Sequence, residues 1–325
     1  MADLRAPFPW FGGKRRVAAE VWRRFGAVRN YVEPFFGSGA VLLARPQPFA
    51  GVETVNDADG LLCNFWRAVQ ADPAAVAAAA DWPVSECDLH ARHLVLVERR
   101  VEITERLMAD PLWYDAKLAG WWVWGACAWI GSGWCSGEGP WVRQDGRLVK
   151  RDAGQGIKRQ VPHLGGNHDS GRGVIAIARR DGLAAAMAEL AGRLRGVRIA
   201  CGDWSRVLGD SATWRHGVTG VLLDPPYDDG AMEYGAGGRG IAADVRAWAV
   251  VAGRRPDMRI ALCGYSEHDE LAGAGWTRHG WKAGGGYGNQ GGADADDNRH
   301  RETVWFSPSC IGAAQPGLFD NAEVA

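Results

Sequence analysis

The sequence lacks the features of several protein classes. Its seven cysteines form no CxxC pair, and their number is odd. The sequence therefore indicates neither a zinc site nor a disulfide framework. The amino terminus has no apolar signal-peptide core. The longest apolar run, residues 118–133, is shorter than the roughly 20 residues that span a bilayer. We therefore expect a cytoplasmic protein that enters no membrane.

The chain also has little net charge. Its formal charge is −1, so any nucleic-acid-binding surface must gather the basic residues on one face. The 325 residues, 47% of them hydrophobic, suffice for one large domain or for a core domain with an insert. Tryptophan (17) and glycine (45) are abundant, which combines large flat side chains with positions where the backbone can approach a ligand closely.

Short β-type runs alternate with helical stretches over much of the chain. The predicted strands are residues 30–33, 51–56, 197–202, 218–223, 259–264 and 303–306, and the predicted helices include 15–25, 61–70, 183–194 and 242–253. This alternation predicts an α/β fold with a mostly parallel sheet covered on both faces. In such sheets, ligands bind at the carboxyl ends of the strands.

Residues 82–178 interrupt this alternation and predict an insert with a small core of its own. A charged amphipathic stretch (88–108) precedes a Trp-rich run (121–134), whose tryptophans we expect to be core residues rather than base-stacking groups. Between residues 141 and 180, nine Lys/Arg and three Asp give 9 − 3 = +6. This segment is the candidate phosphate-binding face, and a solvated loop without a partner is the alternative.

Two constellations point to a nucleotide-like ligand. Residues 31–41 form an apolar strand that runs into a glycine turn (Gly37, Gly39) and a predicted helix, whose amino end can bind a carboxylate or phosphate. Asp57 follows the next strand, where a carboxylate can accept hydrogen bonds from ribose hydroxyls. Asp57 and Asp59 could equally be ordinary helix caps, and a lone GxG turn is a weak signal.

The strongest single motif is Asp224-Pro225-Pro226-Tyr227, which follows the apolar run 220–223. The two prolines stiffen the backbone and restrict the residue before each of them to extended conformations. A fixed carboxylate and a proline carbonyl can accept the two protons of an exocyclic amino group, while Tyr227 stacks on the base. The motif therefore predicts a site that holds the amino group of a nucleobase.

Together these motifs resemble the Dam-like (D12 class) DNA adenine-N6 methyltransferases. The resemblance rests on residues 10–14 (WFGGK), 33–41 (EPFFGSGAV), Asn56-Asp57 with 64–66 (NFW), 202–204 (GDW) and 224–227 (DPPY), in the order of the family's α arrangement. It implies a Rossmann-like fold that binds S-adenosylmethionine, with an inserted target-recognition domain. It also implies methylation of a flipped adenine in double-stranded DNA, without a covalent enzyme intermediate.

The resemblance assigns a role to each matching residue. Trp10 and Lys14 would lie near the methionine end of the cofactor, Asp57 on its ribose, and Asp203 on its adenine amino group with Trp204 beside it. The cofactor loop would consist of Glu33, Pro34, Phe35, Gly37, Ser38 and Gly39. The target base would be held by Asp224, Pro225, Pro226 and Tyr227.

The predicted domains follow from the same motif order. We expect a catalytic domain of residues 1–81 and 179–306, a target-recognition insert of 82–178 and a flexible tail of 307–325. The DNA-binding candidates in the insert, basic or able to reach base edges, are Arg143, Lys150, Arg151, Lys158, Arg159, Gln160, His163, Asn167, His168 and Arg172.

The tail contains a second candidate interaction. Gln315, Leu318 and Phe319 resemble the short peptides that bind bacterial sliding clamps, and a chance match is as good an explanation because only three positions are fixed. We further expect a monomer or weak dimer that associates with the nucleoid.

Four alternatives remain at this point. Cytosine-N4 methylation uses the same geometry, although that family more often has Ser in place of Asp224. An inactive DNA-binding regulator, a protein glutamine methyltransferase and an RNA substrate are the others. The sequence gives neither the recognition site nor any sign of whether a partner nuclease exists; no Pro-Cys motif supports cytosine-C5 chemistry.

Overall fold

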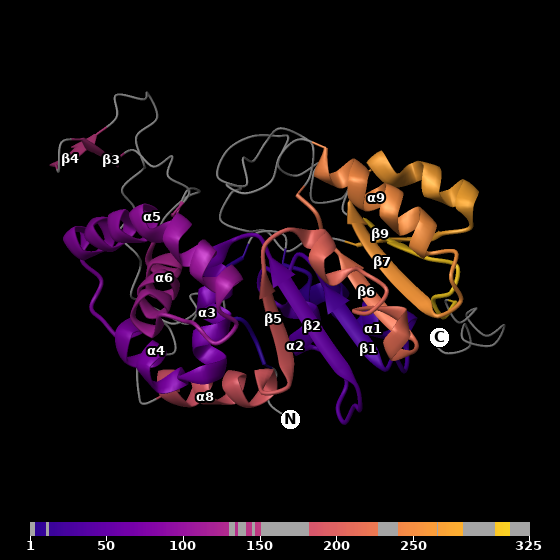
Figure 1. Cartoon of the computed structure of the whole chain (residues 1–325), viewed down its shortest axis with the longest axis horizontal. Coiled ribbons are helices and arrows are strands. Elements are labelled where there is room, and N and C mark those ends of the chain that lie inside the picture. Colours follow the sequence, from indigo (N-terminus) through magenta and orange to yellow (C-terminus); the bar gives the residue numbers. More distant parts are fainter. Residues whose placement is uncertain are drawn as a thin grey trace, which may run out of the picture.

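The structure is a computed structural model. It describes residues 4–10, 13–129, 134–135, 141–144, 147–150, 182–226, 240–264, 266–281 and 303–312. Among these, the central feature is a seven-stranded sheet with the strand order β5-β2-β1-β6-β7-β9-β8 (Figure 1). The strands are β1 (Asn30–Glu33), β2 (Val52–Asp57), β5 (Val197–Cys201), β6 (Thr219–Leu223), β7 (Met258–Gly264), β8 (Thr277–Gly280) and β9 (Thr303–Phe306).

The sheet is mostly parallel, as predicted. The pairs β1–β2, β1–β6, β2–β5 and β6–β7 are parallel, whereas β9 runs antiparallel to its neighbours β7 and β8. Each of the six predicted strands is present within one residue of its predicted ends. The fold is therefore Rossmann-like, and the sequence-based prediction is confirmed.

The strand order creates a switch point between β1 and β6. From β1 the chain continues to β2 and β5 on one side, and it then returns to place β6 and β7 on the other side. The loops that leave β1 and β6 therefore diverge at the carboxyl ends of these two strands. In open α/β sheets this divergence is where ligands bind.

Alternating side chains give the sheet two buried faces. Tyr31 and Leu222 belong to one hydrophobic cluster, whereas their neighbours Val32 and Val221 belong to the other. The first face is covered by α1 (Arg15–Phe25), α2 (Ala40–Leu43), α3 (Gly60–Ala71) and α8 (Gly182–Leu194), and the second by α9 (Ile241–Ala252) with the 3-10 helices η1 (Trp204–Val207), η2 (Trp214–His216) and η3 (Ser266–Ala274). The result is a three-layer α/β/α sandwich.

Side-chain caps fix the starts of the helices that follow β2. Asp59 accepts a hydrogen bond from Leu61 N at the start of α3, and Asp72 caps α4 (Pro73–Ala80) in the same way. Ser85 caps α5 (Glu86–Ala109), and Asp115 caps α6 (Ala116–Ala128). Each cap satisfies a backbone N–H that would otherwise lack a partner, which is worth about 1 kcal/mol.

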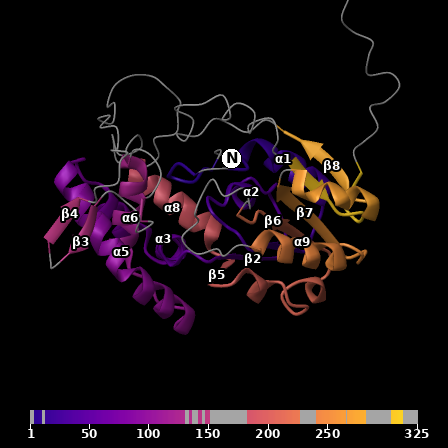
Figure 2. The same cartoon turned by 90° about the horizontal axis from the view of Figure 1, so that it is seen from above.

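Helices α5 and α6 do not form the separate small core that we expected for the insert. Their buried side chains Leu96 and Trp122 lie in the same cluster as Phe65 of α3, and α6 packs against both α3 and α4. The two sets of helices share one core because aromatic rings pack between them. The ring centroid of Phe8 lies 5.0 Å from that of Trp122 and 5.4 Å from that of Phe65. Figures 1 and 2 both place α5 and α6 beside α3, at the opposite end of the molecule from α9.

The first part of the insert is thus continuous with the catalytic layer. The tryptophans Trp122 and Trp124 are buried, which confirms the prediction that they are core residues. The described part of the basic segment consists of a hairpin of β3 (Trp141–Gln144) and β4 (Arg147–Lys150). The predicted domain boundaries themselves stay a prediction.

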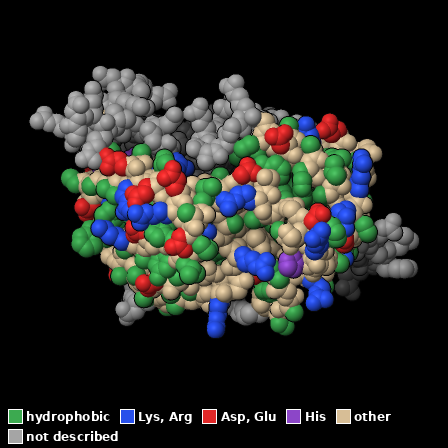
Figure 3. All heavy atoms as spheres, in the orientation of Figure 1, with side chains coloured by type: hydrophobic (Ala, Val, Ile, Leu, Met, Phe, Trp, Pro, Cys, Tyr) green, Lys and Arg blue, Asp and Glu red, His purple; other side chains and the backbone are tan. Residues whose placement is uncertain are grey.

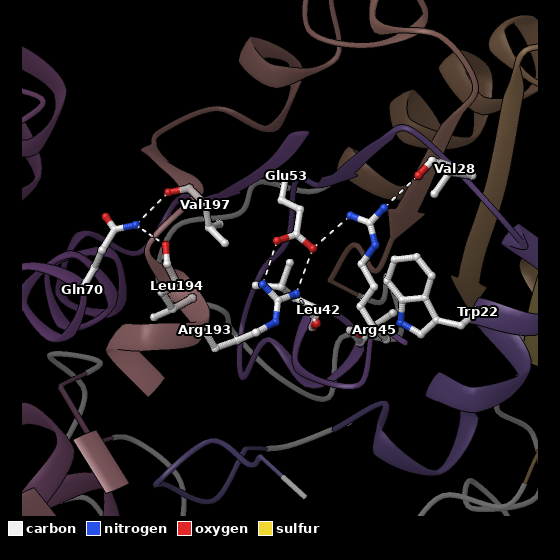
Figure 4. Close-up of polar contacts among 10 residues, drawn as sticks. Trp22, Val28, Leu42, Arg45, Glu53, Gln70, Arg193, Leu194 and Val197 are labelled. Atoms are coloured by element: carbon white, nitrogen blue, oxygen red, sulfur yellow. Dashed lines mark hydrogen bonds and ion pairs between the residues drawn. The ribbon is translucent and has the colours of Figure 1, made fainter. Parts of the chain in front are cut away.

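A buried charge cluster ties β2 to the helical layer (Figure 4). Glu53 of β2 accepts hydrogen bonds from Arg45 at 3.0 Å and from Arg193 of α8 at 2.7 and 2.8 Å. The Arg45 guanidinium also lies 5.1 Å from the Trp22 ring centroid. One buried carboxylate with two guanidinium groups is stable only when its hydrogen bonds are satisfied, so this cluster fixes the relative position of three segments.

Residues 307–312, at the start of the predicted tail, make specific contacts with the rest of the described structure. We expected a flexible tail from residue 307, but residues 307–312 pack on α1 and β7. Ser307 Oγ accepts a hydrogen bond from Ile260 N, and Ile311 N donates to Arg24 O. These backbone partners have no sequence signature, so the sequence alone could not indicate the contacts; the bounds of the tail stay a prediction. No described helix has the length and hydropathy needed to cross a bilayer.

Candidate active site

The predicted site residues converge at the carboxyl ends of four neighbouring strands. Glu33 ends β1 and Asp57 ends β2, while Asp203 and Asp224 follow β5 and β6. These strands lie side by side in the order β5-β2-β1-β6. Residues that are scattered along the sequence thus meet at one edge of the sheet, at the switch point.

The loop after β1 owes its shape to two glycines. Gly37 and Gly39 have φ values of 49° and 63°, a left-handed conformation that side chains rarely adopt. A Cβ at Gly37 would lie 2.6 Å from the indole nitrogen of Trp10. Trp66 Nε1 donates to Gly37 O at 3.0 Å from below. The loop is therefore clamped between two tryptophans, and Trp10 remains 39% exposed above it.

The helix that follows this loop is shorter than the sequence suggested. α2 contains only four residues, and its N-cap is Gly39 without a side-chain cap. Its amino end is too short to act as a dipole-based anion site. Ligand contacts here must come from the loop itself and from Asp57.

Asp57 and Asp59 differ in their contacts, and only Asp59 caps the following helix. Asp59 is the cap of α3, whereas the two oxygens of Asp57 accept hydrogen bonds from Gly37 N and Asp59 N, each at 3.0 Å. Burial raises the pKa of Asp57 to about 6, although these backbone donors oppose the shift. A carboxylate oxygen has more than one lone pair, so Asp57 can still accept further hydrogen bonds.

Asn56 completes this connection between the strands. Its side-chain nitrogen donates to Pro34 O at 3.1 Å and to Gly202 O at 3.0 Å. It therefore joins the loops after β1 and β5 to the end of β2. Asn56 belongs to the Asn-Asp motif at residues 56–57, but the sequence alone does not assign it a role in the site.

Lys14 forms an ion pair with the carboxylate of the tetrapeptide. The distance from Lys14 Nζ to Asp224 Oδ1 is 3.0 Å, and the two side chains are 5% and 24% exposed. The Lys14 ammonium also lies 5.9 Å from the Trp281 ring centroid. The ion pair brings the amino-terminal motif and the tetrapeptide into contact and holds the Asp224 carboxylate in one orientation.

Glu33 lies beneath this pair as a buried acid. Burial raises its pKa well above the ordinary value, and the carboxyl groups of Asp224 and Asp57 raise it further. Tyr31 donates a hydrogen bond to Glu33 Oε2 at 2.8 Å. This bond lowers the pKa of Glu33, but its effect is smaller than that of burial. Glu33 therefore retains its proton to higher pH than an ordinary carboxyl group and adds less negative charge to the site.

Asp203 and Trp204 occupy the β5 side of the site. Asp203 is exposed and caps η1, because its carboxylate accepts hydrogen bonds from Ser205 N and Oγ. The Trp204 ring stacks with Phe35, with centroids 6.3 Å apart and an angle of 23° between the planes. The cofactor roles of Asp203 and Trp204 stay predictions.

Several predicted residues lie outside the described part of the chain or have undescribed side chains. Pro225 is buried and Pro226 and Ser38 lie in the described loops, whereas Tyr227 lies outside the described residues. The same holds for Arg151, Lys158, Arg159, Gln160, His163, Asn167, His168, Arg172, Gln315, Leu318 and Phe319. For Arg143 and Lys150, only the backbone positions in β3 and β4 are described.

The described surface does not carry a basic patch on the face seen in Figure 3. There, acidic and basic side chains of the described residues are interspersed. On α5, Glu102 pairs with both Arg99 and Arg106. Most of the candidate residues of the predicted phosphate-binding face lie outside the described part of the chain.

The fold and the site together define an α/β protein whose acidic and glycine-rich segments meet at the carboxyl ends of β1, β2 and β6. Comparison with known families gives its class: residues 10–88 match the model of the D12 class N6 adenine-specific DNA methyltransferase family. The chain is therefore an adenine-specific DNA methyltransferase, and the resemblance noted in the sequence is confirmed. No curated protein is significantly similar to the chain.

The match includes the motifs at residues 10–14, 33–41, 56–57 and 64–66 but ends before Asp203 and Asp224. The structure supplies the connection between the two parts, because Lys14 lies within the matched residues and Asp224 outside them. Enzymes of this kind generally use S-adenosylmethionine, and their substrate is DNA.

Proposed function

We propose that this methyltransferase binds S-adenosylmethionine across the carboxyl ends of β1 and β2 and methylates a flipped adenine beside Asp224. The observation that carries the proposal is the Lys14–Asp224 ion pair at the switch point, next to Asp57 and the glycine loop. The cofactor would supply an electrophilic methyl group to the amino nitrogen of the base.

The residues present fit such a cofactor. Asp57 offers a carboxylate for the ribose hydroxyls, and its hydrogen bond from Gly37 N keeps the glycine loop beside it. The absence of a Cβ at Gly37 and Gly39 lets the rings of Trp10 and Phe36 pack directly against the loop, which fixes its backbone. Trp10, which covers Gly37, gives an apolar surface for the methionine part, and Asp203 is the proposed acceptor for the adenine amino group.

The chemistry requires an unpaired base, because the amino group of adenine is out of reach in a duplex. Flipping the base costs a few kcal/mol. Asp224 and the Pro225 carbonyl then accept the two amino protons, and Tyr227 and Pro226 hold the ring. These contacts direct the lone pair of the nitrogen towards the methyl group, so the rate comes from positioning and electrostatics.

Lys14 has a specific part in this arrangement. Its ammonium lies on Oδ1 of Asp224, which leaves Oδ2 to accept an N–H of the base. The ion pair holds the carboxylate in a single rotamer while the base enters. Preorganisation of this kind avoids a reorganisation cost during the reaction.

The proposal is tested by Asp224→Ala, with Asp244→Ala as the control, since Asp244 is an exposed carboxylate on α9. Titration calorimetry should give wild-type cofactor affinity for both variants, and tritium transfer to unmethylated DNA should be absent only in Asp224→Ala. Sequencing of modified bases in DNA from expressing cells identifies the base and the target site. Turnover by Asp224→Ala at the wild-type rate would exclude this role for the carboxylate.

We further propose that residues 82–178 recognise the target sequence through the basic segment that begins at residue 141. Single alanine variants of its basic and polar candidates should have lower DNA affinity. Each variant that loses a phosphate contact should also reduce the slope of log affinity against log salt concentration by about one. Unchanged affinity in all variants would exclude this assignment.

The tail motif leads to a separate proposal: Leu318 and Phe319 dock on a sliding clamp of the cytoplasmic replication machinery, which would bring a monomeric enzyme to the nucleoid. Removal of residues 314–325 should abolish retention on an immobilised clamp, whereas retention of the truncated protein would disprove the interaction.

A further inference from the structure

A continuous chain of polar contacts links the cofactor side of the site to the base of the recognition segment. At one end, Asp57 Oδ1 accepts a hydrogen bond from Asp59 N at 3.0 Å. Asp59 Oδ2 pairs with Arg100 Nη2 at 3.2 Å. At the other end, Arg100 Nη1 donates to Cys135 O at 3.0 Å. A single guanidinium on α5 therefore contacts both the loop after β2 and the chain that leads into β3.

Cys135 is firmly anchored to the helical layer. Its N–H donates to His93 Nδ1 at 3.3 Å, its side chain is buried, and its φ is 57°. Burial lowers the pKa of His93 to about 4, so this nitrogen remains unprotonated and able to accept. The His93 ring stacks on Trp129 at 5.0 Å, and Trp134 Nε1 donates to Trp122 O at 3.0 Å.

The other end of the chain of contacts is equally well fixed. Gly60, next to Asp59, lies so close to α5 that a Cβ there would meet Thr104 Oγ1 at 2.1 Å. Thr104 Oγ1 in turn donates to Arg100 O at 2.9 Å. The start of α3 and the middle of α5 are thus in direct contact, without an intervening side chain. A displacement of α5 or of Cys135 must be accommodated at Asp59.

We propose that Arg100 is a positioning residue that couples target recognition to cofactor binding, by transmitting the position of Cys135 through Asp59 to Asp57. This inference rests on the proposed function, because it takes Asp57 as a cofactor ligand and the segment after Cys135 as the DNA-recognition segment. DNA that engages this segment stabilises the Arg100-linked arrangement of Asp57. Because coupling between two sites is reciprocal, bound cofactor strengthens DNA binding by the same factor.

The partial exposure of the pair suits this role. Arg100 and Asp59 are 21% and 27% exposed, so the bond can be made and broken at a cost smaller than that of a fully buried pair. The neighbouring Arg99 differs in its partners: it pairs with Glu102 at 3.2 Å and Asp115 at 3.5 Å. Arg99 therefore provides a matched control on the same helix.

The test compares the dissociation constant of sinefungin, an unreactive analogue of the cofactor, with and without sheared unmethylated genomic DNA. Full-length wild type, Arg100→Met, Asp59→Asn and Arg99→Met are compared by titration calorimetry. In Asp59→Asn the side-chain oxygen still caps α3, so this variant removes the charge without removing the cap.

We expect the wild type and Arg99→Met to bind the analogue roughly fivefold or more tightly in the presence of DNA. In Arg100→Met and Asp59→Asn this ratio should fall to about one, while their affinity without DNA and their melting temperature change little. Arg100→Lys, which keeps the charge but not the two-pronged contact, should give an intermediate ratio.

A wild-type ratio in Arg100→Met, or a ratio of one in the wild type, would overturn the coupling but leave the methyltransferase proposal intact. Failure of all four proteins to bind the analogue would overturn both. If Arg100→Met does not fold, the ratio in Asp59→Asn decides: a wild-type value there overturns the coupling.

Discussion

The ionisation of Asp57 should control the affinity for the cofactor. Burial raises its pKa to about 6, and ribose hydroxyls bind more strongly to the ionised carboxylate than to the acid. Only the ionised fraction of the free enzyme is then competent to bind. Lowering the pH from 8 to 5 takes the group from almost fully ionised to about one-tenth ionised, so the dissociation constant should rise roughly tenfold.

Asp57 should also make the free energy of unfolding depend on pH, with a sign opposite to that of an ordinary salt-bridged carboxylate. The folded state binds the proton more tightly than the unfolded chain, whose Asp has a pKa near 3.9. The free energy of unfolding therefore falls as the pH rises from about 4 to about 6, by at most about 3 kcal/mol for a shift of about two pKa units. Because Asp57 is only partly buried, the measured change should be smaller.

Titration calorimetry with sinefungin between pH 5 and 8 measures this dependence directly. Asp57→Asn should bind roughly 10-fold to 100-fold more weakly at pH 8, as expected for loss of a charged hydrogen-bond acceptor, and its affinity should be independent of pH. Asp244→Asn, which changes an exposed carboxylate on α9, should retain the wild-type profile. A flat profile in the wild type, or an unchanged slope in Asp57→Asn, would refute the assignment of Asp57.

Three further predictions follow from the contacts in the site and beneath it. In a double-mutant cycle of Lys14→Met and Asp224→Asn, chemical denaturation should give a coupling energy of about 1–3 kcal/mol, and additive effects would contradict a stabilising ion pair. Gly37→Ala places a Cβ 2.6 Å from the Trp10 indole at a positive φ, so cofactor affinity should fall at least tenfold in calorimetry, and wild-type affinity would contradict a rigid loop. Glu53→Gln removes the carboxylate between two buried arginines, so the free energy of unfolding should drop by about 3–5 kcal/mol while methyl transfer persists at low temperature; an unchanged melting temperature would contradict this role.

The sheet could be predicted from the sequence because each buried strand is a short run of residues that favour β structure. The run 219–223 (TGVLL) is buried along its whole length, and Asp224, the carboxylate proposed to hold the base, follows it. Glycines and prolines mark where such runs stop. These signals are local, and local signals are what a single sequence contains.

The contacts between distant segments could not be predicted in this way. The Trp-rich run of α6 gave a correct prediction of burial but not of the partner, because periodicity shows which side of a helix is apolar and not what covers it. The ion pair of Lys14 with Asp224 likewise joins two segments that lie far apart in the sequence. Both motifs were recognised singly, and only the fold reveals that they touch.

The different contacts of Asp57 and Asp59 show why their spacing in the sequence could not tell which of them caps the helix. Asp57 is the last residue of β2, and Asp59 is the extended residue before α3. A helix cap must occupy that extended position to reach the first free N–H groups, so Asp59 takes the cap and Asp57 is left to face the glycine loop. The same geometry makes the cap a neighbour of Arg100. The proposed cofactor carboxylate is therefore fixed not by its own strand alone but by a helix whose position depends on α5. That dependence is the physical reason to expect that recognition of DNA and binding of the cofactor influence each other.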